Sequence, residues 1–253
     1  MKAAEVRIET SDSSIPCHTF HPSPSSSDPE ANPGPWPAIV YFMDGMGIRP
    51  TLLESAAKLA RHGYFVLVPD LYHRSGDYAP LDHSTLQDDP VQQGRVMEML
   101  EHVTNENVVR DMQAYLSFLD AQPEAKSERV GVVGYCLGGR LALSAAGRFP
   151  ERVAVAAAIH GASMATDQSD SAHLLADRMR ASIYVAVAEH DPYIIPGETE
   201  ILDAALRDAG ADYSLELYEG CHHGFALLGA HGYDAAADER HRAKLLSMCE
   251  AHL

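Results

Sequence analysis

The chain has 253 residues, which is enough for one α/β domain with a substantial core. Its formal net charge of -17 argues against nucleic acid and anionic membranes as partners, and the overall field would repel an anionic substrate. We expect no signal peptide and no membrane-spanning segment, because no apolar run approaches the roughly 20 residues that cross a bilayer. The four cysteines lack a C-x-x-C pair, so we expect reduced thiols and a cytoplasmic location.

Apolar segments alternate with amphipathic ones along the first half of the chain. We expect strands over residues 5–9, 15–20, 38–43 and 64–68, and a helix over residues 52–60. Residues 71–95 are polar and irregular, and a loop of this length in a compact domain often contributes to function. An apolar helical face over residues 108–119 follows.

The second half of the chain alternates in the same way. We expect strands at 130–133, 153–159, 183–188 and 213–218, with helices after 137, around 201–206 and over 234–252. Residues 213–218 alternate between apolar and polar side chains, which is typical of a half-exposed strand near a sheet edge. This order predicts a doubly wound, mostly parallel sheet with helices on both faces, and residues 1–253 contain no sign of a second domain.

The most informative motif is Gly134-x-Cys136-x-Gly138, which lies between a predicted strand and a predicted helix. It matches the nucleophile elbow of the α/β-hydrolases, with cysteine in place of serine. Such a turn strains its central residue and leaves no room for larger side chains two positions to either side. Cys136 would lie at a helix N-terminus, where free N–H groups favour a thiolate. A glycine-rich turn around a structural cysteine is the alternative, but the flanking strand and helix favour catalysis.

Two further residues follow predicted strands in an order that fits this elbow. Active sites of such sheets lie outside the carboxyl ends of the strands. Asp191 and His223 both follow predicted strands, which gives the nucleophile–acid–histidine order of the α/β-hydrolases. Asp191-Pro192 is also a common turn sequence, and His222 adjoins His223. We prefer His223 because Gly224 suits a loop that turns this histidine inward.

These side chains predict nucleophilic catalysis on an ester. The thiolate of Cys136 would attack the carbonyl carbon, and His223 would serve first as base and then as acid. Asp191 would fix the imidazole tautomer and stabilise its positive charge. The oxyanion hole would use the backbone N–H groups of Leu137 and Gly45.

At this point the chain resembles the dienelactone hydrolase family of α/β-hydrolases. The resemblance rests on the elbow at residues 134–139, on Pro69-Asp70-Leu71-Tyr72-x-Arg74, on Asp191 and on His223-Gly224-Phe225. It implies hydrolysis of a small cyclic or activated ester through a Cys–His–Asp triad, without a metal or an organic cofactor.

Two positions depart from the pattern that the resemblance implies. Members that cleave dienelactones hold the thiol with a glutamate where this chain has the shorter Asp44, although Asp44-Gly45 is equally typical of an ordinary turn. Those members also clamp the substrate carboxylate with two arginines. Arg74 matches one of them and Leu227 replaces the other, so we expect a preference for neutral or weakly anionic esters.

Other classes of function stay open. A non-catalytic binding or redox-sensing protein could use a hydrolase scaffold with Cys136 as its reactive thiol, although the complete triad argues against this. The 14 histidines suggest metal binding, but the sequence has no H-E-x-x-H motif and no paired cysteine spacing. The acyl and alcohol groups of the substrate cannot be read from the loops at 71–95 and 161–182.

Overall fold

The computed structural model of the chain describes residues 1–23, 34–78, 81 and 86–253, and a single sheet joins its eight described strands. The strands are β1 (Lys2–Glu9), β2 (Ser14–His21), β3 (Trp36–Phe42), β4 (Phe65–Pro69), β5 (Ala125–Tyr135), β6 (Val153–Ile159), β7 (Ser182–His190) and β8 (Tyr213–His222). Their order is β1-β2-β4-β3-β5-β6-β7-β8. The pairs that involve β1 or β2 are antiparallel, and β3 to β8 run parallel.

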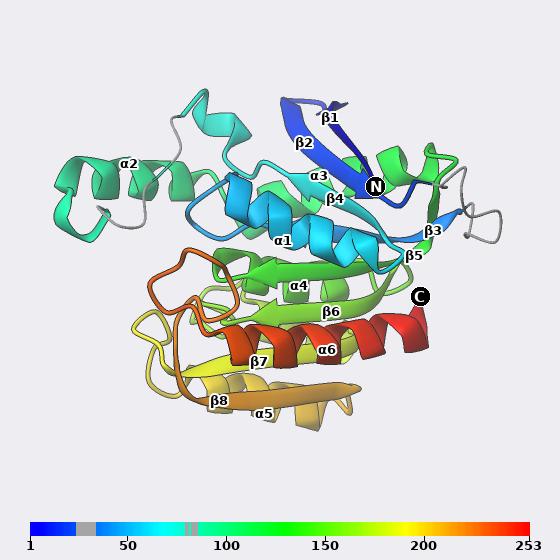
Figure 1. Cartoon of the computed structure of the whole chain (residues 1–253). Helices are drawn as coiled ribbons and strands as arrows, with labels where there is room; N and C mark the ends of the chain where they lie inside the picture. The colour runs from blue at the N-terminus through cyan, green and yellow to red at the C-terminus, as the bar shows by residue number, and fades with distance from the viewer. Residues whose placement is uncertain (24–33, 79–80, 82–85) are drawn as a thin grey trace.

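Helices cover both faces of this sheet. They are α1 (Pro50–Arg61), α2 (Pro90–Glu101), α3 (Asn105–Asp120), α4 (Leu137–Arg148), α5 (Glu198–Asp208) and α6 (Ala235–His252), with 3₁₀ turns at His73–Ser75, Leu86–Asp88 and Ala172–Arg178. In Figure 1, α1 and α6 lie in front of the sheet, while α3 and α4 lie behind it. The predicted doubly wound, mostly parallel sheet is therefore confirmed.

Central and edge strands differ as their sequences predict. All seven residues of β6 are buried, because helices pack on both of its faces. Strand β8 lies at the end of the strand order and keeps several half-exposed residues, so the predicted edge position is confirmed. Since β3 to β8 are parallel, their carboxyl ends meet at the same edge of the sheet.

One helix begins inside a segment that we expected to be irregular. Helix α2 starts at Pro90, and the side chain of Asp89 accepts hydrogen bonds from the backbone N–H groups of Val91 and Gln92. A capping aspartate followed by proline is a strong helix start, because the proline loses no hydrogen bond in the first turn. The expectation for residues 71–95 was thus wrong from residue 90 onward, while 79–80 and 82–85 lie outside the described residues.

The turn after β5 has the strained backbone that the elbow motif predicts. Cys136 has φ 53° and ψ -116°, a backbone conformation that residues other than glycine rarely adopt. A Cβ atom at Gly134 would lie 1.9 Å from the carbonyl oxygen of Gly138. A Cβ atom at Gly138 would lie 2.8 Å from the carbonyl oxygens of Phe42 and Met43, so the elbow packs directly against the end of β3.

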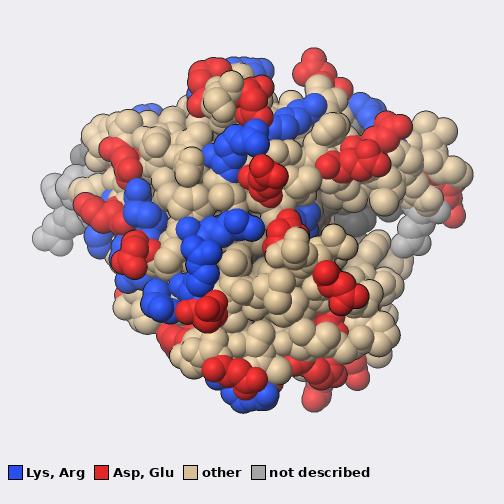
Figure 2. Space-filling view, turned by 180° about the vertical axis from the view of Figure 1, so that it is seen from behind, with Lys and Arg blue, Asp and Glu red and all other residues tan. Residues whose placement is uncertain are grey.

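Charges of both signs share the surface. Figure 2 shows acidic side chains spread over the face seen from behind, with lysine and arginine side chains between them. Within the described ranges, no helix combines the length and the apolar character that crossing a membrane requires.

We predict that Gly134→Ala lowers the free energy of unfolding by about 3 kcal/mol or more, because its methyl group would overlap a backbone carbonyl that cannot move freely. Gly94 in α2 provides a matched control, since a Cβ atom there meets open space. Gly94→Ala should raise the free energy of unfolding by about 0.5–1 kcal/mol. Equilibrium denaturation in urea compares the variants, and a Gly134→Ala protein as stable as the wild type would contradict this packing.

Candidate active site

The predicted catalytic side chains all emerge where parallel strands end. Cys136 follows β5, Asp191 follows β7 and His223 follows β8. Strand β8 pairs with β7 through the register His190↔His222, which sets the loops that carry Asp191 and His223 side by side. The fold therefore brings together three residues that are far apart in the sequence.

His223 and Asp191 form a close, shielded pair. Nδ1 of His223 lies 2.7 Å from Oδ2 of Asp191, and their side chains are 13% and 2% exposed. The other carboxylate oxygen of Asp191 accepts a hydrogen bond from the backbone N–H of Tyr193 at 3.0 Å. With Nδ1 directed at the carboxylate, Nε2 of the imidazole is left for a second partner, and the thiol of Cys136 lies near enough to influence the ring.

The surroundings of His223 favour its protonated form. Burial alone would lower the pKa of the imidazole, but the hydrogen bond to Asp191 and the influence of the Cys136 thiol outweigh burial and raise the pKa to about 10. A protonated ring can donate to the carboxylate and to the sulfur at the same time. The arrangement therefore suits an imidazolium on His223 near neutral pH.

The neighbouring His222 lies outside this arrangement. Its side chain is on the exposed side of β8, and its ring contacts that of His190 with centroids 5.0 Å apart. Gly224 turns the chain after His223 with φ 85°, as the sequence suggested. The structure thus brings His223, and not His222, to Asp191.

Both N–H groups named for the oxyanion hole lack an acceptor in the part of the chain that the structure describes. Leu137 is the first residue of α4, where an N–H has no partner within the helix. Gly45 follows the end of β3, and its N–H makes no hydrogen bond, although Met46, Gly47 and Ile48 each donate one. Gly138 packs on the carbonyl of Met43, which brings the two segments together.

Asp44 faces an arginine and makes no hydrogen bond to Cys136 among the described residues. Its two carboxylate oxygens lie 2.5 Å and 2.8 Å from Nη1 and Nη2 of Arg49. The suggested role of Asp44 in holding the thiol stays a prediction.

The two positions named for substrate recognition have other surroundings. Arg74 donates to both oxygens of Asp111 at 2.7 Å and to Asp12 at 3.2 Å and 3.3 Å. Leu227 is 1% exposed and lies in the turn that follows His223. Arg74 is therefore paired with two carboxylates and Leu227 is buried, and their contact with a substrate stays a prediction.

Two aromatic side chains that the sequence analysis did not single out enclose the ring of His223. His160 packs edge-on at a centroid distance of 5.0 Å and is fully buried, while Tyr193 packs at 4.6 Å and is 60% exposed. Neither ring nitrogen of His160 has a hydrogen-bond partner within the described residues. His160 directly follows β6, so its position at the carboxyl end of a strand could have identified it as a candidate site residue. No sequence pattern identifies Tyr193 in the same way.

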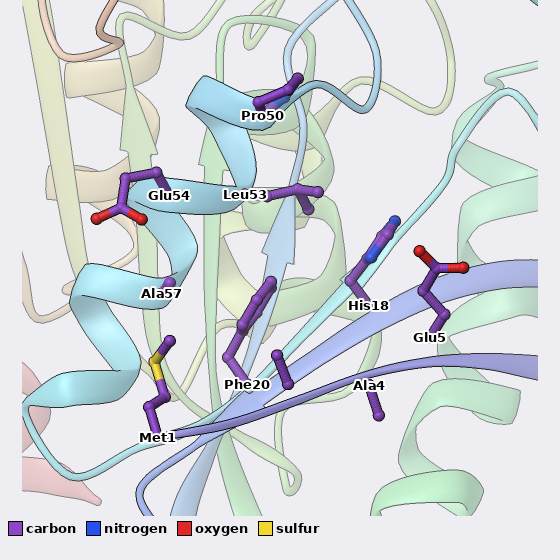
Figure 3. A pocket seen from close by; sticks show the side chains of 10 residues that line it. Met1, Ala4, Glu5, His18, Phe20, Pro50, Leu53, Glu54 and Ala57 are labelled. Atoms are coloured by element: carbon purple, nitrogen blue, oxygen red, sulfur yellow. The ribbon is translucent and has the colours of Figure 1, made fainter.

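Other features of the molecule do not extend this site. No group of three or more potential metal ligands occurs among the residues that the structure covers. The groove in Figure 3 is lined by α1 and the β1–β2 pair, including Met1, His18, Phe20, Leu53 and Glu54. These strands lie at the opposite edge of the sheet from β7 and β8, so the groove is separate from the triad.

We predict that Asp191→Asn lowers the pKa of His223 from about 10 toward its ordinary value of 6.5, because an amide cannot stabilise the imidazolium as a carboxylate does. In the wild type, protonation of His223 stabilises the folded protein fully below about pH 6.5, and this contribution is lost as the pH rises through about 10. An NMR titration of the imidazole measures the midpoint, with His222→Gln as control. An unchanged midpoint in Asp191→Asn would contradict the pairing.

Comparisons with known proteins agree with this fold and with the resemblance. Residues 26–253 of the chain match the sequence model of the dienelactone hydrolase family. A protein of Methylorubrum extorquens, provisionally named a carboxymethylenebutenolidase, is 32% identical over 139 residues, which are 55% of this chain but only 42% of that protein. A Synechocystis protein with the same provisional name is 23% identical over 222 residues, which are 86% of this chain and 87% of that protein.

Solved structures give the same result for the fold. A crystal structure from Klebsiella pneumoniae, provisionally identified as a dienelactone hydrolase, superposes with a TM-score of 0.79 at 22% identity. The superposition covers 98% of this chain and 97% of that one. The chain has the α/β-hydrolase fold and belongs to the dienelactone hydrolase family.

Proposed function

We propose that the protein is a cysteine-dependent hydrolase of lactones or carboxylic esters. The observation that carries this proposal is the place of the His223 imidazole between the Asp191 carboxylate and the Cys136 thiol, at the tip of a strained elbow. Relatives named as carboxymethylenebutenolidases support a lactone or a similar small ester as the substrate. The same combination of nucleophile, histidine and acid recurs in acyl transfer on many folds because the chemistry demands this geometry.

In the acylation step, the thiolate of Cys136 attacks the carbonyl carbon and forms a tetrahedral intermediate. The N–H groups of Leu137 and Gly45 donate to its oxyanion. The intermediate collapses, the bond to the alcohol oxygen breaks, and protonated His223 gives its proton to the departing oxygen. Acylation thus leaves a thioester on Cys136 and a neutral imidazole on His223.

In the deacylation step, His223 acts as the base. Its neutral imidazole takes a proton from water, and the resulting hydroxide attacks the thioester carbonyl. The second tetrahedral intermediate uses the same two N–H donors and then expels the thiolate. Asp191 stabilises the imidazolium that forms in this step and holds the tautomer that faces the sulfur. One histidine therefore serves both steps without a cofactor.

We further propose that the substrate is neutral or weakly anionic. Arg74 and Arg49 are each paired with carboxylates of the protein itself. A substrate carboxylate would have to compete with Asp111 and Asp12 for Arg74. The net charge of -17 adds a general repulsion.

The location and the domain organisation are inferred in the same way. All four cysteines are free, which agrees with the reducing cytoplasm that we propose as the location. We infer that residues 1–253 form one domain, since a single sheet joins every described strand. No observation favours the alternative of a redox-sensing protein without ester turnover, in which Asp191 and His223 would have no chemical role.

We predict that Cys136→Ala abolishes ester hydrolysis, whereas alanine at Cys17, Cys221 or Cys249 leaves it largely intact. Burial raises the pKa of Cys17 and Cys221, and it raises that of Cys249 to about 12, so these thiols are poor nucleophiles. Cys136→Ser should be much weaker than the wild type, because the site is not tuned to deprotonate an alcohol. Steady-state hydrolysis of a short aryl ester measures each variant, and turnover by Cys136→Ala would disprove the assignment.

We also predict that a lactone without a free carboxylate has the higher kcat/KM of a matched pair that differs only in that group. A charge-assisted hydrogen bond contributes about 1.5–3 kcal/mol, so a site in which Arg74 is already paired with Asp111 and Asp12 forgoes roughly 10–150-fold in affinity for the anion. The wild type is the protein to use, since an arginine at the buried Leu227 would place a charge in the core. A more than tenfold preference for the carboxylate partner would contradict this prediction.

A further inference from the structure

We propose that the ion pair between Asp44 and Arg49 is a positioning clamp for the oxyanion loop, defined here as residues 44–49. The clamp would fix this loop so that the N–H of Gly45 stays available to the oxyanion of a substrate. The inference rests on the proposed function. It gives Asp44 a role in shaping the oxyanion hole in place of the suggested role in holding the thiol.

The clamp is bidentate and shielded from water. Nη1 and Nη2 of Arg49 donate to Oδ1 and Oδ2 of Asp44 at 2.5 Å and 2.8 Å, and the side chains are 10% and 6% exposed. Nη1 also donates to the carbonyl oxygen of Gly47 at 3.1 Å. Parallel hydrogen bonds between an arginine and a carboxylate fix direction as well as distance. Arg49 thus joins both ends of the loop to its middle.

The backbone of the loop folds around the same carboxylate. Oδ1 of Asp44 accepts a hydrogen bond from the N–H of Met46 at 3.2 Å, and the carbonyl oxygen of Asp44 accepts one from the N–H of Gly47 at 3.2 Å. The peptide between Asp44 and Gly45 is trans, so its N–H points opposite to its carbonyl. Because the carbonyl is directed into the loop, the N–H of Gly45 is directed out of it.

Two tyrosine hydroxyls hold the loop from the other side. The hydroxyl of Tyr72 donates to the carbonyl oxygen of Gly45 at 2.7 Å. The hydroxyl of Tyr78 accepts from the N–H of Ile48 at 3.1 Å and donates to Asp70 at 3.1 Å. Both tyrosines follow β4, the neighbour of β3 in the sheet. Among residues 45–48 of the described chain, the N–H groups of Met46, Gly47 and Ile48 are therefore engaged, and that of Gly45 has no acceptor.

This arrangement makes the clamp distinguishable from a thiol-holding acid. A carboxylate that held the thiol would alter the reactivity of the sulfur itself. A clamp alters only reactions that develop charge on a carbonyl oxygen. Alkylation of a thiolate by iodoacetamide forms no oxyanion, whereas acylation by p-nitrophenyl acetate does, so the two reactions of Cys136 separate the two roles.

The experiment compares both rates in the wild type and in the double variant Asp44→Asn/Arg49→Met, which leaves no unpaired buried charge. We expect the acylation rate constant to fall by about 10–100-fold, as for a misplaced catalytic group, with the alkylation rate and KM unchanged. In Arg49→Lys the acylation rate constant should fall less, since the ammonium group keeps the positive charge but cannot form the bidentate contact of the guanidinium. Arg61→Met is the matched control, because Arg61 pairs with Glu54 on α1 at an exposed position.

Thermal unfolding identifies variants that do not fold. If the double variant does not fold, the same two rates are measured in Tyr72→Phe, which removes only the hydroxyl that donates to the carbonyl oxygen of Gly45. It should slow acylation and leave alkylation unchanged. Unchanged acylation in the folded variants would overturn the clamp, as would parallel changes in acylation and alkylation, which would mark Asp44 as an acid that acts on the thiol. A wild type that is alkylated but never acylated would instead overturn the proposed function, and the clamp with it.

Discussion

The strained backbone at Cys136 is the constraint on which the rest of the site depends. A residue held at φ 53° and ψ -116° costs about 1–3 kcal/mol and persists only where its surroundings leave no alternative. Here the close contacts of Gly134 and Gly138 hold the backbone of Cys136 in this conformation. They also pack the turn against the end of β3. The sulfur therefore projects from a fixed point between a strand and a helix N-terminus. Under the proposed mechanism, this sulfur is the reference point: His223, Asp191 and Gly45 can act only if they are correctly placed relative to it.

The surroundings of His223 and His160 shift the pKa values of these two neighbouring imidazoles in opposite directions. The rings of His223 and His160 are 5.0 Å apart, so both cannot easily carry a charge. His223 has a carboxylate and a thiol as partners, which raise its pKa against the effect of burial. Burial lowers the pKa of His160 well below its ordinary value, and the nearby His223 lowers it further. His160 thus packs against the ring of His223 from the buried side as a neutral group.

Local patterns predicted the strands and the elbow because these depend on neighbours in the sequence. Apolar runs marked the strands, and the spacing of Gly134, Cys136 and Gly138 marked the elbow. The partners of Arg74 could not be predicted, since Asp12 and Asp111 lie 62 and 37 residues away and meet it only in the folded chain. The pairing of Asp44 with Arg49 depends on loop conformation, which the Asp-Gly pair alone does not specify. Helix α2 was missed although Asp89-Pro90 signals its start.

The most direct measurement is the identification of the acylated residue during turnover. The protein is mixed with an activated aryl ester, quenched in acid within the transient phase, digested and analysed by mass spectrometry. The proposed mechanism predicts an acyl group on the peptide that contains Cys136, which forms before steady state and disappears as the substrate is consumed. Ester hydrolysis without any acyl group on Cys136, or with the acyl group on Cys17, Cys221 or Cys249, would contradict it.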